Sequence, residues 1–234
     1  MAVRALLFDF DGLIVETEGP AFRVWQETYE QHGAELTLAE WSAAVGTLQG
    51  FDPVGRLEEL TGLALDRDEL RERAWAEHRR LVADEALRPG VSEYLAESFA
   101  LGLDVAVVSS AGAAWVTGHL EQRGIRDGWH SIHCADGDPS IAKPRPDLYL
   151  AALAALGFAA EEGIAIEDSP NGVAAAKAAG LVCIAVPNTI TRELDLGAAD
   201  LVLDSLADLP LAELLAWAER AGQARPYGPT IRRL

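Results

Sequence analysis

Short apolar runs alternate with helix-like segments along most of this 234-residue sequence, and this alternation narrows the possible folds more than any other feature. Apolar runs of strand length are expected at 5–8, 104–108, 131–135, 163–166, 182–186 and 201–203. Helix-like segments, several of them closed by glycine, are expected at 91–101, 112–123, 147–156, 172–179 and 211–221. This alternation predicts βαβ units, a parallel sheet and right-handed crossovers.

A long helical block interrupts the alternation directly after the first strand. Helices are expected from Pro20 to about Gly33, then from Thr37, where Glu40 completes the spacing of a capping box, and finally over 54–61 and 66–84. No convincing strand falls in this block. We therefore predict an α/β protein. Residues 1–14 and 88–234 form a Rossmann-like parallel-sheet core, and residues 15–87 form a small all-helical domain inserted after the first strand.

Charge and composition restrict the partners of the chain. A formal net charge of -18 argues against nucleic acid or an anionic membrane as a partner, because either would be repelled. Cys134 and Cys183 lie in apolar runs and are expected to be reduced core residues. No apolar run reaches about 18 residues and the N-terminus lacks the layout of a signal peptide, so we expect a cytoplasmic protein. The oligomeric state and the order of the tail at 225–234 are not predicted.

Two carboxylates follow the first apolar run. Asp9 and Asp11 are two residues apart and precede Gly12. At the carboxyl end of a parallel strand, both side chains can point into the crevice where open α/β sheets bind ligands. Two carboxylates in such a place repel each other and lose water, which is costly unless a cation lies between them. Taken alone, the stretch fits an ordinary Asp-Gly turn equally well.

Polar residues also follow three later strands. They are Ser109 and Ser110, Asp136 and Asp138, and Glu167 and Asp168, with Lys143 in the loop before the helix at 147–156. Simpler explanations exist: Ser109 and Ser110 as a helix N-cap, Lys143 as a surface residue, and Glu167 and Asp168 as residues at a helix start. Because the carboxyl ends of parallel strands meet at one edge, the groups together predict a single site.

Four of these stretches resemble the ordered signatures of the haloacid dehalogenase-like hydrolase (HAD) superfamily. They are Phe8-Asp9-Phe10-Asp11-Gly12, Val107-Val108-Ser109-Ser110, Lys143-Pro144 and Ile166-Glu167-Asp168-Ser169. The helical insertion after the first signature is similar to that of the helical-cap subgroup, which includes the β-phosphoglucomutase-like phosphatases. The resemblance spans residues 4 to about 204.

The resemblance implies a phosphoryl-transfer site. Asp9 would be the nucleophile that forms an aspartyl-phosphate, and Asp11 would be the general acid and then the general base. Ser109 and the backbone N–H of Ser110 would bind phosphoryl oxygens, and Lys143 would neutralise the phosphoryl group and the nucleophile. Mg²⁺ would be bound by Asp9, the Asp11 carbonyl and Asp168, with Glu167 as a direct or indirect ligand.

Two features favour a phosphatase over other members of the superfamily. The dehalogenases lack an acid at the position of Asp11. The phosphomutases need cationic cap residues for a second phosphate, but their histidine position falls at Ala21, the loop at 45–49 has no cation, and Arg56 is too far along the chain. We therefore expect a Mg²⁺-dependent phosphatase of a small phosphorylated metabolite, either a sugar phosphate or a nucleoside monophosphate. A sugar phosphomutase is the alternative.

We expect the inserted helices to determine which substrate binds. Glu16, Thr17 and Glu18 are expected to face the site from the first linker, and Trp25, Gln49 and Phe51 are candidate substrate contacts. The alternative interpretation is that Trp25 belongs to the core of the cap and that Gln49 is an ordinary loop residue. Linkers at about 13–19 and 84–90 would act as hinges that open and close the cap.

Two other classes of protein combine similar residues. A phosphoaspartate signalling receiver also joins acids, a hydroxyl residue and a lysine on a parallel sheet, but it is about half as long and has its phosphoacceptor on a later strand. A catalytically inactive binding protein could also keep the fold. The five central groups argue against this: Asp9, Asp11, Ser109, Lys143 and Asp168 are all present.

Overall fold

The computed structural model describes residues 2–42, 45 and 51–223. Within these residues, a six-stranded sheet has the order β3-β2-β1-β4-β5-β6, and every neighbouring pair is parallel. The strands are β1 (Ala5–Phe8), β2 (Asp104–Ser109), β3 (Ser131–Cys134), β4 (Gly163–Glu167), β5 (Val182–Ala185) and β6 (Leu201–Val202). The predicted parallel α/β core is confirmed.

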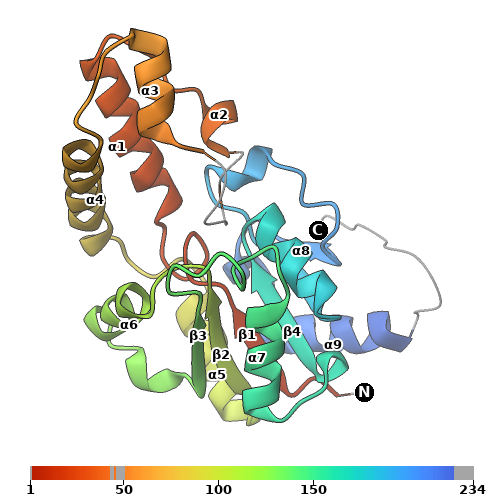
Figure 1. Cartoon of the computed structure of the whole chain (residues 1–234). Coiled ribbons are helices and arrows are strands. Elements are labelled where there is room, and N and C mark those ends of the chain that lie inside the picture. Colours follow the sequence, from red (N-terminus) through yellow and green to blue (C-terminus); the bar gives the residue numbers. More distant parts are fainter. Residues whose placement is uncertain (1, 43–44, 46–50, 224–234) are drawn as a thin grey trace.

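Helices connect the strands and cover both faces of the sheet (Figure 1). In chain order they are α1 (Glu18–Gln31), α2 (Leu38–Ser42), α3 (Pro53–Thr61), α4 (Arg67–Ala83), α5 (Val91–Leu101), α6 (Ala113–Gln122), α7 (Asp147–Leu156), α8 (Pro170–Ala178) and α9 (Leu211–Gln223). Short 3₁₀ turns lie at Arg126–Gly128, Ala160–Glu162, Thr191–Glu193 and Leu206–Asp208.

Alternate residues of each central strand pack into different layers. In β1, Leu6 and Phe8 belong to a core shared with α5, α6 and α9, whereas Ala5 and Leu7 belong to a core shared with α7 and α8. This alternation follows from the two-residue period of a strand. Because both faces are buried, the strand is continuously apolar, and this is the pattern that made it recognisable in the sequence.

The position of β1 decides where the polar residues meet. It lies between β2 and β4, and the chain moves outward in one direction through β2 and β3 and in the other through β4, β5 and β6. Open α/β sheets bind ligands at the carboxyl ends of the strands beside such a reversal of strand order. The residues that follow β1 and β4 are therefore brought to the place where a site is expected.

The inserted helices α1–α4 form a helical cap beyond the carboxyl edge of the sheet (Figure 1). They have a small core of their own, made by the buried side chains of Tyr29, Leu36 and Leu57. The expected capping box is present: Thr37 Oγ1 accepts from Glu40 N at 3.3 Å, and Glu40 Oε2 accepts from Thr37 N at 3.2 Å. The two connections to the core lie side by side, since Val15 forms an antiparallel bridge with Leu87.

In the described part of the chain, no helix combines the length and the apolar character needed to cross a membrane. Cys134 and Cys183 are free thiols, as expected, and Cys183 is fully buried.

Candidate active site

A sharp turn follows β1 and places Asp9 and Asp11 at the edge of the sheet. Asp9 N continues the sheet by donating to Ile166 O at 2.9 Å, and Gly12 then turns the chain with φ of 77°. A Cβ atom at Gly12 would collide with the side chains of Asp168 and Asn188. Glycine is therefore required here both for the left-handed backbone and for the close approach of Asp168.

Four buried charged side chains meet at this turn. Lys143 forms ion pairs with Asp9 Oδ1 and, at 2.6 Å, with Glu167 Oε1. Asp168 accepts a 2.7 Å hydrogen bond from Asn188 Nδ2 through its Oδ2 atom. All four charged residues are at most 5% exposed, and the structure places Asp9, Lys143, Glu167 and Asp168 together, as the sequence predicted.

Burial perturbs the ionisation of this cluster. It raises the pKa of Asp9 against the opposing effect of Lys143, and it raises the pKa of Asp168 well above its ordinary value, with Asp9 and Glu167 adding to the rise. Burial also raises the pKa of Glu167 to about 7. Although burial by itself lowers the pKa of Lys143, the negative charges of Asp9 and Glu167 raise it overall. One ammonium group thus faces three carboxyl groups, an excess of negative charge that favours a bound cation.

The cluster fits a hard divalent cation. One carboxylate oxygen from each of Asp9, Glu167 and Asp168 can be chosen so that all three lie within 4.8 Å of one another. Asp9 Oδ2 is buried and has no hydrogen-bond partner among the described residues, and the same holds for Glu167 Oε2. Oxygen-only donors with unsatisfied lone pairs suit Mg²⁺. Glu167 also accepts a 2.5 Å hydrogen bond from Tyr149 OH, which holds its other oxygen.

Asp11 lies beside the cluster in a different environment. Its Oδ1 accepts a 2.8 Å hydrogen bond from Trp115 Nε1, and its Oδ2 accepts one from Ser109 Oγ at 3.3 Å. Burial and the negative charge of Asp9 raise the pKa of Asp11 to about 6, against the lowering effect of the Trp115 hydrogen bond. A carboxyl group with such a pKa can both give and take a proton near neutral pH.

Two serines at the end of β2, Ser109 as its last residue and Ser110 directly after it, hold the loops of the site. Ser109 Oγ accepts from Ala111 N at 3.0 Å, and Ser110 Oγ accepts from Lys143 N at 3.2 Å. Neither serine is an N-cap, because α6 begins at Ala113 after Gly112. The structure thus sets aside the simpler explanation of these serines and places Ser109 next to Asp11.

One expected member of the site lies elsewhere. Asp136 accepts a 2.6 Å hydrogen bond from Ala113 N and so holds the first turn of α6, while Asp138 Oδ1 accepts from Ser140 N at 2.8 Å in an exposed loop. The expectation that this acidic pair joins the site was wrong. The strand before it is next to β2 at the outer edge of the sheet, away from the reversal between β1 and β4.

The residues expected to contact the substrate from the first linker and the cap differ from one another in burial and in their contacts. Glu16 Oε1 accepts from Gly19 N at 3.1 Å, and Thr17 is buried while its carbonyl contacts His78 Nε2 at 3.0 Å. Burial raises the pKa of Glu18 to about 8, and the negative charges of Asp11, Glu16 and Asp9 add to the rise. Gln49 lies outside the described residues.

Sequence reasoning missed several residues of the site. Asn188 is a polar residue shortly after strand β5, so it fits the same pattern as the polar residues recognised at the ends of the other strands. Tyr149 lies in the first turn of α7. Trp115 has no local signal, because an aromatic residue on an amphipathic helix is usually a core residue. Arg88 joins the cap linker to the core by donating to the carbonyls of Gly12, Val186 and Pro187.

Comparison with known proteins agrees with this geometry. The sequence profile of the haloacid dehalogenase-like hydrolases matches residues 3–180, and the chain belongs to this family of enzymes. It is 43% identical over 213 residues to the Bacillus subtilis protein named "Putative phosphatase YhcW", covering 91% of this chain and 96% of that one.

Solved structures are similar over nearly the whole chain. CbbY from Rhodobacter sphaeroides in complex with phosphate is 31% identical with a TM-score of 0.73, covering 91% of this chain and 99% of that chain. A mutant of the same protein in complex with xylulose-(1,5)bisphosphate has the same TM-score. A HAD family hydrolase from Deinococcus radiodurans with bound phosphate and sodium is 30% identical with a TM-score of 0.75, covering 93% of this chain and 97% of that chain.

Proposed function

We propose that this protein is a Mg²⁺-dependent phosphatase that hydrolyses a small phosphorylated metabolite through an aspartyl-phosphate on Asp9. The observation that carries the proposal is the buried cluster in which Lys143 binds one oxygen of Asp9 while the other oxygen has no partner among the described residues. Mg²⁺, bound by Asp9, the Asp11 carbonyl, Asp168 and, directly or through a neighbour, Glu167, would supply charge neutralisation at the nucleophile and the phosphoryl group.

The protein side chains divide the reaction into two displacements. In the first, the Asp9 carboxylate attacks phosphorus, the bond from phosphorus to the ester oxygen breaks, and protonated Asp11 gives its proton to that oxygen, which leaves as the alcohol. In the second, ionised Asp11 takes a proton from water, the water oxygen bonds to phosphorus, and Asp9 leaves as a carboxylate. The pKa of about 6 at Asp11 suits both roles.

Phosphoryl oxygens would be bound by Ser109 Oγ, the backbone N–H of Ser110 and the ammonium group of Lys143. Ser109 Oγ is buried beside Asp11, and the backbone N–H of Ser110 follows it at the end of β2. Lys143 contributes a positive charge in a fixed position. Its attraction to the transferring phosphoryl group becomes stronger as negative charge develops there. These contacts offset the repulsion that an anionic substrate meets from a chain of net charge -18.

The cap favours a phosphatase over the alternative, a sugar phosphomutase. Arg56 is engaged by Glu40 at 2.9 Å and by Glu59 at 3.3 Å, and Ala21 stands where a mutase histidine is expected. A second phosphate would therefore find little charge to bind it. Domain boundaries at 14/15 and 87/88 fit this scheme, with paired linkers that let the cap open for exchange and close to exclude water.

Hydrolysis of p-nitrophenyl phosphate tests the proposal. We expect phosphate release that requires Mg²⁺, stops with EDTA, and falls by at least about 10³-fold in Asp9→Asn, because that variant lacks a nucleophile. Asp138→Asn serves as the matched control, since Asp138 lies in an exposed loop away from the cluster. Activity that persists in Asp9→Asn or in EDTA would refute the nucleophile or the metal assignment. Formation of glucose 6-phosphate from glucose 1-phosphate without phosphate release, in the presence of glucose 1,6-bisphosphate, would instead identify a mutase.

A further inference from the structure

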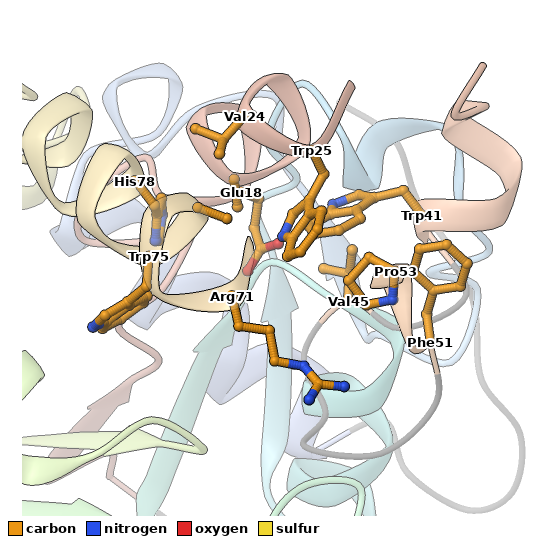
Figure 2. Close-up of a pocket in the computed structure, with 12 residues that line it drawn as sticks. Glu18, Val24, Trp25, Trp41, Val45, Phe51, Pro53, Arg71, Trp75 and His78 are labelled. Carbon is orange, nitrogen blue, oxygen red and sulfur yellow. The ribbon is translucent and has the colours of Figure 1, made fainter. Parts of the chain in front are cut away.

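A pocket of about 470 Å³ lies in the cap, a size typical of sites for small ligands. Figure 2 shows Trp25 and Glu18 in its middle, Trp75 and His78 on one side, and Trp41, Phe51 and Pro53 on the other. Aliphatic side chains of α1 and α4 complete its walls. The pocket is therefore dominated by aromatic rings.

The pocket is connected to the proposed catalytic residues in two ways. Glu18 lines it and is close enough to Asp9 and Asp11 to respond to their charge. On the other side, the ring of Trp75 lies 4.9 Å from that of Trp115, whose indole N–H binds Asp11. A substrate with its phosphate at Asp9 would thus direct the rest of its structure toward this pocket.

The charges of the pocket do not suit a second phosphate. Arg71 is the one arginine or lysine among the described residues that line it, and this side chain is already paired with Asp52 at 3.1 Å and Asp68 at 4.0 Å. Burial lowers the pKa of His78, so this ring is neutral near pH 7. In the sequence, the stretch 43–50 that precedes Phe51 contains no lysine or arginine. A dianion here would lose water and gain only the charge of Arg71, which Asp52 and Asp68 already share.

One aromatic ring of the pocket, that of Trp75, is partly exposed and available to a ligand. Trp25, Trp41 and Phe51 pack on the cap core, but Trp75 does not belong to that core and is 45% exposed. Its neighbours are His78 and Trp115, with ring centroids at 5.4 and 4.9 Å, and the Arg79 guanidinium, 5.7 Å from the ring centroid. A partly exposed aromatic ring can bind a flat ring by stacking, a contact that tolerates differences in the ring.

We propose that this pocket binds a planar ring carried by the alcohol part of the substrate, so that the enzyme prefers ring-bearing phosphate monoesters such as nucleoside 5′-monophosphates to simple sugar phosphates or sugar bisphosphates. This inference rests on the proposed phosphatase function. Glu18 can form a hydrogen bond with the polar edge of the ring, while Trp25 and Trp75 contact its faces.

A matched pair of substrates tests the proposal. Uridine 5′-monophosphate and ribose 5-phosphate share the same leaving group, the 5′-oxygen of ribose, and differ in the base. We expect kcat/KM to be at least about tenfold higher for the nucleotide, the effect of one good stacking contact. Equal values, a preference for ribose 5-phosphate or a sugar bisphosphate, or turnover of neither while p-nitrophenyl phosphate is hydrolysed would overturn the ring preference and leave the phosphatase function intact. Failure to hydrolyse any ester would refute the phosphatase function itself.

Variants of the aromatic walls locate the preference. Trp25→Leu and Trp75→Leu should each lower the ratio of kcat/KM between the two substrates, toward one. The partly exposed position of Trp75 keeps the test valid if Trp25→Leu disturbs the cap. Phe99→Ala is the matched control, because Phe99 is a 51% exposed aromatic residue on α5 that does not line the pocket. A ratio unchanged in Trp75→Leu and in a folded Trp25→Leu would overturn the assignment of the pocket.

Discussion

The indole Nε1 of Trp115 donates a 2.8 Å hydrogen bond to Oδ1 of Asp11. Trp115 lies on α6 of the core, yet its ring also contacts Trp75 and His78 on α4 of the cap. The side chain that orients the proposed acid and base is therefore held partly by the domain expected to open and close. The cap position and the orientation of Asp11 are linked through one aromatic residue.

Trp115→Phe should slow the reaction without abolishing it. The variant keeps an aromatic ring but removes the donor, so Asp11 is oriented less well and its pKa rises, since the hydrogen bond lowers that pKa. We expect kcat to fall by up to about tenfold, less than the ~10²–10⁴-fold expected for Asp11→Asn. The descending limb of the pH–rate profile should also move to higher pH. Steady-state kinetics from pH 5 to 9 measure both effects, with Trp217→Phe in α9 as the control; a wild-type profile in Trp115→Phe would contradict the role.

Lys143→Met should destabilise the metal-free protein. The substitution leaves Asp9 and Glu167 buried without their counter-charge, and removing one partner of a buried pair costs about 3–5 kcal/mol. Urea unfolding in EDTA measures the loss. Lys177→Met is the matched control, because its 2.5 Å pair with Asp200 is partly exposed and should contribute less. Equal losses in the two variants would show that the buried ion pairs of Lys143 contribute no more to stability than the partly exposed pair of Lys177.

The stability of the metal-free protein should fall as the pH rises from about 4 to 7. The folded-state pKa of Asp11 is raised from 3.8 to about 6 and that of Glu167 from 4.5 to about 7, so the folded protein binds more protons than the unfolded chain in this range. The stability that these groups contribute is complete below their unfolded pKa and is lost as the pH passes the folded pKa. Urea midpoints across this range check the slope.

Mg²⁺ should remove much of that pH dependence, because it stabilises the ionised carboxylates. At 100 times its dissociation constant, a bound ion adds about 2.7 kcal/mol to the free energy of unfolding. Asp168→Asn should lose this response and Asp138→Asn should keep it. If Mg²⁺ does not change the thermal unfolding midpoint at pH 7.5, the proposed metal site at Asp9 is wrong.

Gly12→Ala should abolish activity. The loss in the free energy of unfolding should also be larger than the loss caused by placing alanine in a left-handed backbone conformation alone. The new methyl group would meet Asp168 and Asn188 at a position with φ of 77°. Gly33→Ala is a close control, since Gly33 has φ of 73° and nothing within 4 Å of the added Cβ atom. The control should lose about 1–2 kcal/mol and keep its activity. Wild-type activity in Gly12→Ala would mean that Asp168 need not lie against the turn.

The elements and most of the cluster could be predicted because they carry local signals. Buried parallel strands are continuously apolar, and their ends are marked by polar residues and glycine, so Asp9, Ser109 and Glu167 were recognised as a group. The pattern of a polar residue at a strand end failed for Asp136. This pattern places the residue at the carboxyl edge of the sheet but does not show how far along that edge the residue lies. That distance depends on strand order.

The amino-acid sequence by itself determined the α/β fold, the helical insertion and the residue types of the buried charged cluster, since hydrophobic periodicity and turn chemistry act over a few residues. Only the tertiary structure decided which of the polar residues meet and what surrounds them. The bond from Trp115 to Asp11 spans 104 positions, and that from Lys143 to Asp9 spans 134. Burial raises the pKa values of the carboxyl groups, and it arises when segments distant in the sequence exclude water together. A local sequence pattern therefore does not predict it.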